Sequence, residues 1–139
     1  MPSEILPGLF LGQRPRRYDG FDVVVNCERS IGEGLLEDWS GAFLHVPMRD
    51  SEDFKIDEPV VYAAALLAAM ASEAGRRVLI HCAAGRNRSG LVCGLAVRSV
   101  LGCTGDQAIS LMREKRDLTT GRNGSPVLSN ELFQAFVRR

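Results

Sequence analysis

The chain has 139 residues, of which 45% are hydrophobic, and its 17 acidic and 17 basic side chains give a formal net charge of zero. This length fits one domain, and the hydrophobic content excludes a wholly disordered chain. A neutral chain lacks the broad positive field that draws proteins to nucleic acid, so we expect no nucleic-acid partner. Any anion that the protein binds must therefore be held by local groups.

Segments typical of strands alternate with segments typical of helices along the chain. Apolar and β-branched runs predict strands over residues 9–11, 21–27, 43–47 and 77–81, and helices are predicted over residues 33–39, 57–71, 89–101, 106–116 and 130–137. Residues 118–128 are predicted to form a polar loop, and Ser129 to cap the last helix. The alternation predicts a single α/β domain over residues 1–139, with a mainly parallel twisted sheet of about four or five strands flanked by helices.

Three features bear on the location of the protein. The four cysteines lack paired short spacings, which excludes a zinc pattern and a disulfide framework and favours a reducing, cytoplasmic compartment. The first residues lack a basic region followed by an apolar stretch, so no secretion signal is expected. The most apolar segment, residues 60–74, is too short to span a bilayer and predicts a buried amphipathic helix. We expect a protein without a membrane span, and a monomer is favoured although the sequence leaves the oligomeric state open.

The segment HCAAGRNRSG (residues 81–90) carries the chemistry, since it joins a buried strand to an apolar helix. Main-chain N–H groups of residues 83–88 and the helix N-terminus can point at one anion there. Gly85 allows the backbone conformation that such a turn needs, and Arg88 offers a planar fork for two phosphate oxygens. The same field favours the thiolate of Cys82. Nucleophile and phosphate site coincide, which predicts a phosphocysteine intermediate.

The other residues of this segment have subsidiary predicted roles. Ser89 is predicted either to donate a hydrogen bond to the sulfur when the intermediate breaks down, or only to cap the helix. His81 is predicted to hydrogen-bond the loop main chain, and no metal site is expected because only His45 accompanies it without a ligand cluster. The phosphate-binding residues are predicted to be Ala83, Ala84, Gly85, Arg86, Asn87 and Arg88.

The segment HCAAGRNRSG resembles the HCxxGxxRS signature of the cysteine-dependent protein phosphatases, specifically the compact dual-specificity group. Three further segments, ILPGLFLG, VVVNCE and LSNELFQAF, are similar to the opening strand, second strand and closing helix of that group, in the same order. The resemblance therefore covers nearly the whole chain. It implies a phosphatase fold and a hydrolase that needs neither metal nor cofactor. The implied partners are proteins phosphorylated on tyrosine, serine or threonine.

A general acid is also needed, because cleaving an unactivated phosphate ester requires a proton for the leaving oxygen. The resemblance implies an aspartate on the loop opposite the phosphate site, and the candidates are Asp50 and Asp53. Asp50 is favoured because it directly follows the end of the strand at residues 43–47. The alternatives are Asp53 and a solvated acidic loop without a catalytic role.

Two further roles are implied by the resemblance alone. Cys27, at the end of the strand at residues 21–27, is implied to form a reversible disulfide with Cys82, since a reactive thiolate is prone to oxidation. The alternative is a buried structural cysteine. Asn130 is implied to hydrogen-bond the phosphate loop from the last helix. A simple helix-start role is the alternative, because Ser129 stands where relatives often carry proline.

The substrate class depends on the variable residues of the loop. Arg86 is the one additional arginine among small neutral residues, which favours phosphoproteins over polyphosphorylated lipid headgroups. The short chain has few insertions that could wall a deep pocket, so a shallow site of dual specificity is predicted. A phospholipid or phosphoinositide phosphatase on the same scaffold stays open, as does a non-catalytic phosphate-binding module. The nucleophile, the arginine and the acid together argue against the binding module.

Overall fold

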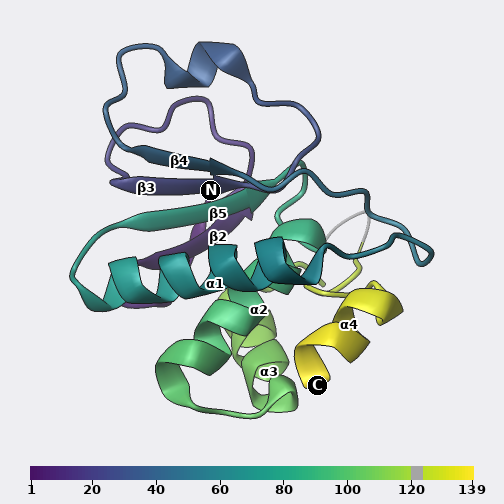
Figure 1. Ribbon diagram of the computed structural model, residues 1–139. Helices are drawn as coiled ribbons and strands as arrows, with labels where there is room; N and C mark the ends of the chain where they lie inside the picture. Colours follow the sequence, from purple (N-terminus) through teal and green to yellow (C-terminus); the bar gives the residue numbers. More distant parts are fainter. Residues whose placement is uncertain (120–123) are drawn as a thin grey trace.

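The computed structural model describes residues 1–119 and 124–139 and shows one α/β domain built on a five-stranded sheet (Figure 1). The strands are β1 (Ser3–Leu6), β2 (Leu9–Gln13), β3 (Val23–Asn26), β4 (Ala42–His45) and β5 (Val78–Cys82). Their order is β1-β2-β5-β3-β4, in which β1 pairs antiparallel with β2 and the other three pairings are parallel. The predicted α/β domain with a mainly parallel sheet is confirmed.

The helices are α1 (Glu58–Glu73), α2 (Arg88–Leu101), α3 (Gly105–Lys115) and α4 (Glu131–Arg138), and η1 (Glu33–Leu36) is a short 3-10 helix. Two elements differ from the prediction. The helix predicted over residues 33–39 is the single turn η1, and β1 was not predicted because its four residues lie at the sheet edge, where alternation over so few positions carries little signal.

Both faces of the sheet are buried. Val23 and Val25 of β3 pack in the main core with the helices, whereas Val24 packs in a smaller core on the opposite face. This alternation follows from the two-residue period of a strand. The smaller core is built around Tyr18, beside aromatic side chains, and the segment with η1 lies over it, away from the helices (Figure 1). Burial on both faces explains why residues 21–27 form a continuous apolar run.

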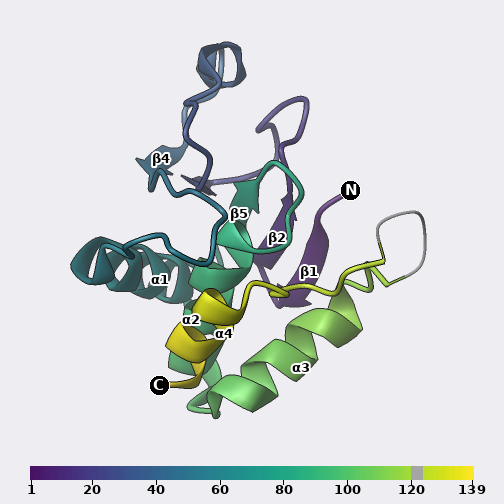
Figure 2. The ribbon, with the colours of Figure 1, turned by 90° about the vertical axis from the view of Figure 1, so that its right-hand side faces the viewer.

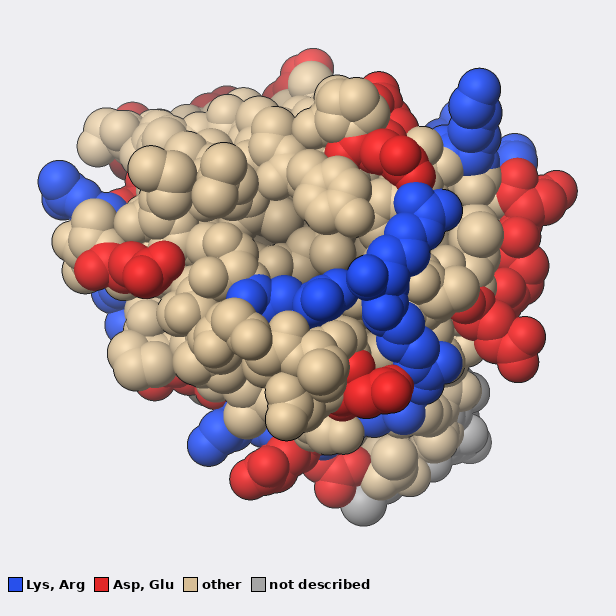
Figure 3. Space-filling view, turned by 60° about the horizontal axis from the view of Figure 1, so that its bottom comes forward, with Lys and Arg blue, Asp and Glu red and all other residues tan. Residues whose placement is uncertain are grey.

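Helix α1 buries four alanines and Val61 and exposes most of its larger side chains. Tyr62, Leu66 and Met70 are 45%, 53% and 61% exposed, and Figure 3 shows a broad uncharged surface beside a band of basic side chains. The prediction of a buried helix over residues 60–74 is wrong for this outer face, because the alanines instead fill the close contact with α2. The buried alanines are Ala64, Ala65, Ala68 and Ala69. Within residues 1–119 and 124–139, no helix is long and apolar enough to cross a membrane.

The segment before α4 also differs from the prediction. Asn130, not Ser129, caps α4, because its side-chain oxygen accepts the N–H of Phe133 at 3.2 Å. The loop predicted as polar contains two fully buried residues, Val127 and Leu128, which pack over the start of α2. Residues 120–123 of that predicted loop lie outside the described residues.

Candidate active site

The phosphate loop, residues 82–88, runs from the carboxyl end of β5 into α2. Ligands of parallel α/β sheets bind at this edge, so the loop has the position that the sequence predicted. Gly85 adopts a φ of 65°, and a Cβ at this position would collide with the main chain of Gly12 in β2. Only glycine therefore fits the turn against the neighbouring strand.

Cys82 lies at the base of this loop, and its residue exposure is only 2%. Its Sγ is 3.1 Å from the hydroxyl oxygen of Ser89, which is fully buried in the first turn of α2. A hydroxyl at this distance can donate a hydrogen bond to a thiolate. The cysteine and the serine are therefore brought together, as a nucleophile and its hydrogen-bond partner require.

The mouth of the loop is open to solvent. Ala83 and Ala84 are exposed, and Arg86 and Arg88 are half-buried. Nη1 of Arg88 donates to the carbonyl oxygen of Met48 at 3.4 Å, which connects the phosphate loop to the segment after β4. We call that segment, residues 46–54, the acid loop.

The carboxylate of Asp50 in the acid loop is held by two amide groups. Nδ2 of Asn87 donates to one carboxylate oxygen and Nδ2 of Asn130 to the other, each at 3.0 Å. Asn130 also donates its main-chain N–H to Oδ1 of Asn87 at 3.0 Å. Asp53, by contrast, has a side chain that is 85% exposed and lies 3.9 Å from Arg49. The geometry thus brings Asp50 to the phosphate loop and leaves Asp53 in solvent.

Glu52 docks the acid loop onto α4, which lies beside α2 (Figure 2). Its two carboxylate oxygens accept the main-chain N–H groups of Glu131 and Leu132, each at 3.0 Å. These are N–H groups that the first turn of a helix leaves without partners inside the helix, and the helix dipole favours an anion there. The two acidic residues on either side of Ser51 therefore have different roles: Asp50 faces the phosphate loop, and Glu52 fixes the acid loop to α4.

A buried polar network lies behind Cys82. The hydroxyl of Tyr18 is 2.7 Å from Nε2 of His81, and Nδ1 of His81 is 3.5 Å from the carboxylate of Glu28. Arg14 forms a two-pronged ion pair with Glu28, with Nε donating at 2.8 Å to one oxygen and Nη2 donating to the other. The network holds His81, the residue that precedes Cys82.

The charge states in this network follow from burial and from Arg14. Burial lowers the pKa of His81 to about 4, although Glu28 and the main chain of Cys82 act in the opposite direction. Burial by itself would raise the pKa of Glu28, but the hydrogen bonds and charge of Arg14 outweigh it and lower that pKa. Burial and Glu28 together raise the pKa of Tyr18 to about 12. At neutral pH, His81 is therefore uncharged between a neutral phenol and a paired carboxylate.

Cys27 lies next to the phosphate loop, since its N–H donates to the carbonyl oxygen of His81 at 2.8 Å. Asn26 of β3 pairs with His81 of β5, so Cys27 and Cys82 occupy corresponding positions of adjacent strands. Both thiols are free, and burial, with a contribution from Cys82, raises the pKa of Cys27 well above its ordinary value. The reversible disulfide between them stays a prediction.

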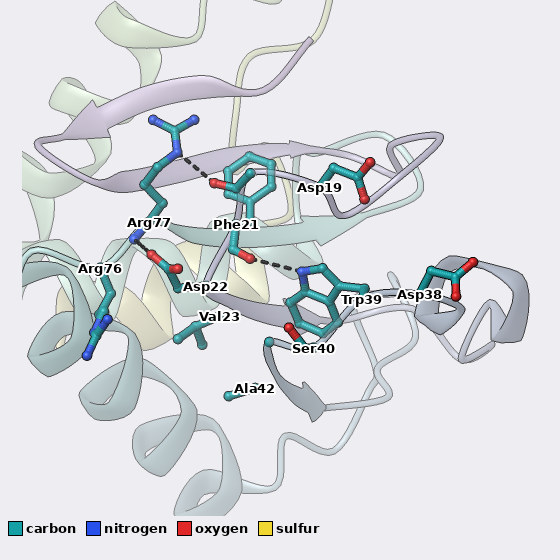
Figure 4. A pocket seen from close by; sticks show the side chains of 12 residues that line it. Asp19, Phe21, Asp22, Val23, Asp38, Trp39, Ser40, Ala42, Arg76 and Arg77 are labelled. Atoms are coloured by element: carbon teal, nitrogen blue, oxygen red, sulfur yellow. Dashed lines mark hydrogen bonds between the residues drawn. The ribbon is translucent and has the colours of Figure 1, made fainter.

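A hollow at the opposite edge of the sheet is unrelated to this loop (Figure 4). It lies at the amino ends of β3, β4 and β5, where Trp39 donates its indole N–H to the carbonyl oxygen of Phe21 at 2.9 Å. The main-chain N–H of Arg77 donates to Asp22 at 2.8 Å, and its Nε donates to Gly20 at the same distance. The indole of Trp39 and the polar groups of Arg77 are thus hydrogen-bonded within the hollow, where they stabilise this end of the sheet.

Three residues that support the candidate site, Glu28, Glu52 and Arg116, were not predicted from the sequence. Glu28 carried a usable signal, because an acidic residue directly after a buried strand is placed at the same edge as Cys82. Glu52 belongs to the acidic run for which a solvated loop was the alternative, and Arg116 is the last residue of the helix predicted over residues 106–116. Glu52 contacts α4 and Arg116 contacts the phosphate loop, and both contacts join segments that are distant in the sequence. No local sequence pattern predicts such contacts.

Among residues 1–119 and 124–139, no group of three His, Cys, Asp or Glu side chains is arranged to hold a metal ion.

The fold and this loop define an α/β protein whose candidate active site combines a buried cysteine, a glycine-dependent turn and a helix N-terminus. The chain belongs to the dual specificity phosphatase family, because the family model "Dual specificity phosphatase, catalytic domain" matches residues 11–125. The resemblance noted in the sequence is thereby confirmed.

Individual relatives agree with this assignment. Dual specificity protein phosphatase 26 of Bos taurus is 33% identical over 97 residues, which cover 63% of this chain and 46% of that protein. The chain thus spans about half the length of this curated relative. The crystal structure of DUSP15 has a TM-score of 0.79 at 19% identity and covers 99% of this chain and 85% of its own. The crystal structure of the human tyrosine phosphatase-like serine/threonine/tyrosine-interacting protein has a TM-score of 0.77 at 19% identity. The match covers 98% of this chain and 92% of that protein's chain. These two structures share the fold.

Proposed function

We propose that the protein hydrolyses phosphate esters of tyrosine, serine and threonine side chains in proteins, through a phosphocysteine intermediate and without a metal ion. The observation that carries the proposal is the placement of Cys82 at the base of a turn that opens α2, with its Sγ 3.1 Å from the Ser89 hydroxyl. A helix N-terminus and successive main-chain N–H groups are the usual protein device for a phosphate dianion.

In the first step, the thiolate of Cys82 attacks phosphorus opposite the leaving oxygen. The S–P bond forms and the P–O bond to the substrate side chain breaks. Arg88 and the loop N–H groups hold the three phosphoryl oxygens and stabilise the charge that they carry. Asp50, protonated at this stage, gives its proton to the leaving oxygen, so a neutral hydroxyl departs.

In the second step, water releases the phosphoryl group. The carboxylate of Asp50 takes a proton from the water, whose oxygen forms the new bond to phosphorus while the S–P bond breaks. The sulfur leaves as a thiolate, and the Ser89 hydroxyl donates a hydrogen bond to it. Inorganic phosphate departs, and both Cys82 and protonated Asp50 are regenerated.

The choice of Asp50 over Asp53 as general acid follows from the acid loop. Hydrogen bonds from Asn87 and Asn130 direct the Asp50 carboxyl group toward the phosphate loop, while Asp53 lies in solvent beside Arg49. An acid must come within hydrogen-bond reach of the leaving oxygen, so the aspartate tied to the phosphate loop is the better candidate.

Exposed residues around the site support a broad choice of substrate. Ala83, Ala84 and Asp50 are exposed, so the candidate site is shallow enough for the short side chains of phosphoserine and phosphothreonine. Two observations require that the lipid phosphatase and the binding module also be tested. Arg86 is an extra cation at the loop, which an inositol phosphate headgroup would use, and one structural neighbour is named a phosphatase-like interacting protein.

The proposal is tested by p-nitrophenyl phosphate hydrolysis in the presence of EDTA. We expect turnover by the wild-type chain, no detectable turnover by Cys82→Ser, and wild-type turnover by Cys103→Ser, a half-buried cysteine outside the loop. Turnover that EDTA abolishes, or that survives in Cys82→Ser, would contradict the mechanism.

The substrate class is then decided with matched phosphopeptides and phosphoinositides. Faster release of phosphate from peptides, on phosphotyrosine and phosphoserine alike, is the expected result. Preference for phosphoinositides would assign the lipid alternative. Phosphopeptide binding without any turnover by the wild-type chain would assign the binding module.

A further inference from the structure

Carbonyl groups of the phosphate loop are held from outside by a buried arginine. Arg116, which follows α3 and is 6% exposed, donates from Nε to the carbonyl oxygen of Gly85 at 2.9 Å. Its Nη2 donates to the carbonyl oxygen of Ala84 at 3.3 Å. On its other side, Nη1 donates to the carbonyl oxygen of Met1 at 2.9 Å and to the hydroxyl of Ser3 at 3.1 Å. The guanidinium is thus fixed between the first residues of the chain and the back of the loop.

A third carbonyl of the loop is held in the same way. The main-chain N–H of Leu128 donates to the carbonyl oxygen of Arg86 at 3.0 Å. The carbonyl groups of residues 84, 85 and 86 are therefore all engaged by donors outside the turn. Each of these carbonyls belongs to the same peptide plane as the N–H group of the following residue.

The direction of the N–H groups follows from peptide geometry. A trans peptide is planar and its N–H points opposite to its C=O, and the described chain has no cis peptide. With three carbonyls directed outward, the N–H groups of Gly85, Arg86 and Asn87 are directed toward the inside of the turn, where the phosphoryl oxygens bind in the proposed function. Peptide planes next to a glycine can rotate at little cost, so hydrogen bonds from outside the turn are needed to hold this orientation.

We propose that Arg116 is a positioning residue for the phosphate site, which fixes the peptide planes at Ala84 and Gly85 so that two N–H groups face the phosphoryl oxygens. The inference rests on the proposed function of the loop. Arg116 acts from behind the loop and not on the substrate, since four of its five N–H donors engage the loop carbonyls, Met1 and Ser3.

The charge of Arg116 acts in the same direction. Burial lowers the pKa of Arg116, while the nearby Cys82 acts to raise it. A guanidinium keeps its proton near neutral pH even after such a shift, so a positive charge stays behind the loop. Unlike Arg88, this cation is placed where it orients main-chain dipoles instead of gripping the phosphate itself.

The test measures binding of inorganic phosphate by calorimetry to the full chain carrying Cys82→Ser, with each variant first shown to be folded. We expect Arg116→Met to weaken phosphate binding by about tenfold or more, because preorganised N–H donors are lost. The matched control is Arg98→Met, since half-buried Arg98 also donates to two main-chain carbonyl groups, of Cys103 and Val137, away from the loop. The control should stay within about twofold of the parent protein.

Two further measurements distinguish the positioning role of Arg116 from a role in stabilising the fold alone. Ser3→Ala removes one contact on the far side of Arg116 but leaves both hydrogen bonds to the loop, so it should weaken phosphate binding much less than Arg116→Met. In the parent, phosphate should shift the amide resonances of residues 85–87 in NMR spectra, and Arg116→Gln, the milder variant if Arg116→Met fails to fold, should reduce the shifts at residues 85 and 86. Folded Arg116 variants that bind phosphate like the parent, or unshifted amides in the parent, would overturn the inference. A parent that does not bind phosphate at all would instead refute the proposed function.

Discussion

The phosphate loop and the acid loop meet around one point, but the molecule holds them by different means. The phosphate loop is backed by buried groups, with His81 and Arg116 behind it and a neighbouring strand pressed against Gly85. The acid loop is exposed at Asp50 and Asp53 and is attached by side-chain hydrogen bonds to α4 and to Asn87. We therefore expect changes in the acid loop to affect the rate of the proposed reaction more than stability, and changes behind the phosphate loop to affect both.

The largest effect is expected for the acid itself. Asp50→Asn should lower kcat for a phosphoserine peptide by about a hundredfold or more, because its poor leaving group needs a proton. The loss for p-nitrophenyl phosphate, whose leaving group is already a good one, should be much smaller. Because Asp50 is exposed, the melting temperature should change little.

The matched control is Asp53→Asn, in the same loop but directed into solvent. It should retain nearly wild-type kcat on both substrates in steady-state assays. A large, leaving-group-dependent loss in Asp53→Asn, with a small one in Asp50→Asn, would reverse the assignment of the acid.

The buried side of the comparison predicts a dependence of stability on pH. His81 has a pKa of about 4 in the folded protein and an ordinary value of 6.5 when unfolded, so between these values the unfolded chain binds the additional proton. Stability should therefore be unaffected by His81 above about pH 6.5 and fall as the pH drops, by about 2 kcal/mol at pH 5.

Urea unfolding of the wild type and His81→Gln at pH 7 and pH 5 checks this expectation. The variant has no imidazole to titrate, so its stability should change less over this interval. Glu28 affects stability only at lower pH. Its pKa in the folded protein lies below the ordinary value of 4.5, so its contribution to stability is lost only as the pH falls below 4.5. Equal pH slopes for the two proteins would show that His81 titrates normally in the fold.

The smallest effect is expected for the docking of the acid loop. Glu52→Gln removes the charge that faces the N-terminus of α4, which contributes about 0.3–1 kcal/mol at an exposed site. We expect kcat for the phosphoserine peptide to fall by about fivefold with KM nearly unchanged, because a looser loop misplaces Asp50. Glu131→Gln is the control, because the exposed Glu131 side chain makes no contact with the acid loop and the variant keeps the main-chain N–H that Glu52 accepts; it should keep the wild-type kcat. A rise in KM without a fall in kcat would mean that Glu52 serves substrate binding instead.

Local sequence was sufficient where structure is decided by neighbouring residues. The phosphate loop is encoded in one short segment, because strand, glycine turn and helix start follow each other directly. The strands and helices around it were predicted for the same reason, since their periodic apolar positions reflect burial. The outer face of α1 could not be foreseen, because the choice between burying alanines or larger side chains depends on how closely α2 approaches.

The amino-acid sequence was sufficient to predict the α/β class and the position of Cys82 in a glycine turn between a strand and a helix. The contacts that hold the candidate site together could be found only in the folded structure: Asn87 and Asn130 on Asp50, Glu52 on α4, and Arg116 behind the loop. Each of these contacts joins residues about thirty to eighty positions apart, so it exists only once the chain has folded and brought the carboxyl edge of the sheet and the last helices together. The zero net charge fits this division, because the proposed anion site uses oriented main-chain groups and a few placed arginines and does not need an overall excess of positive charge.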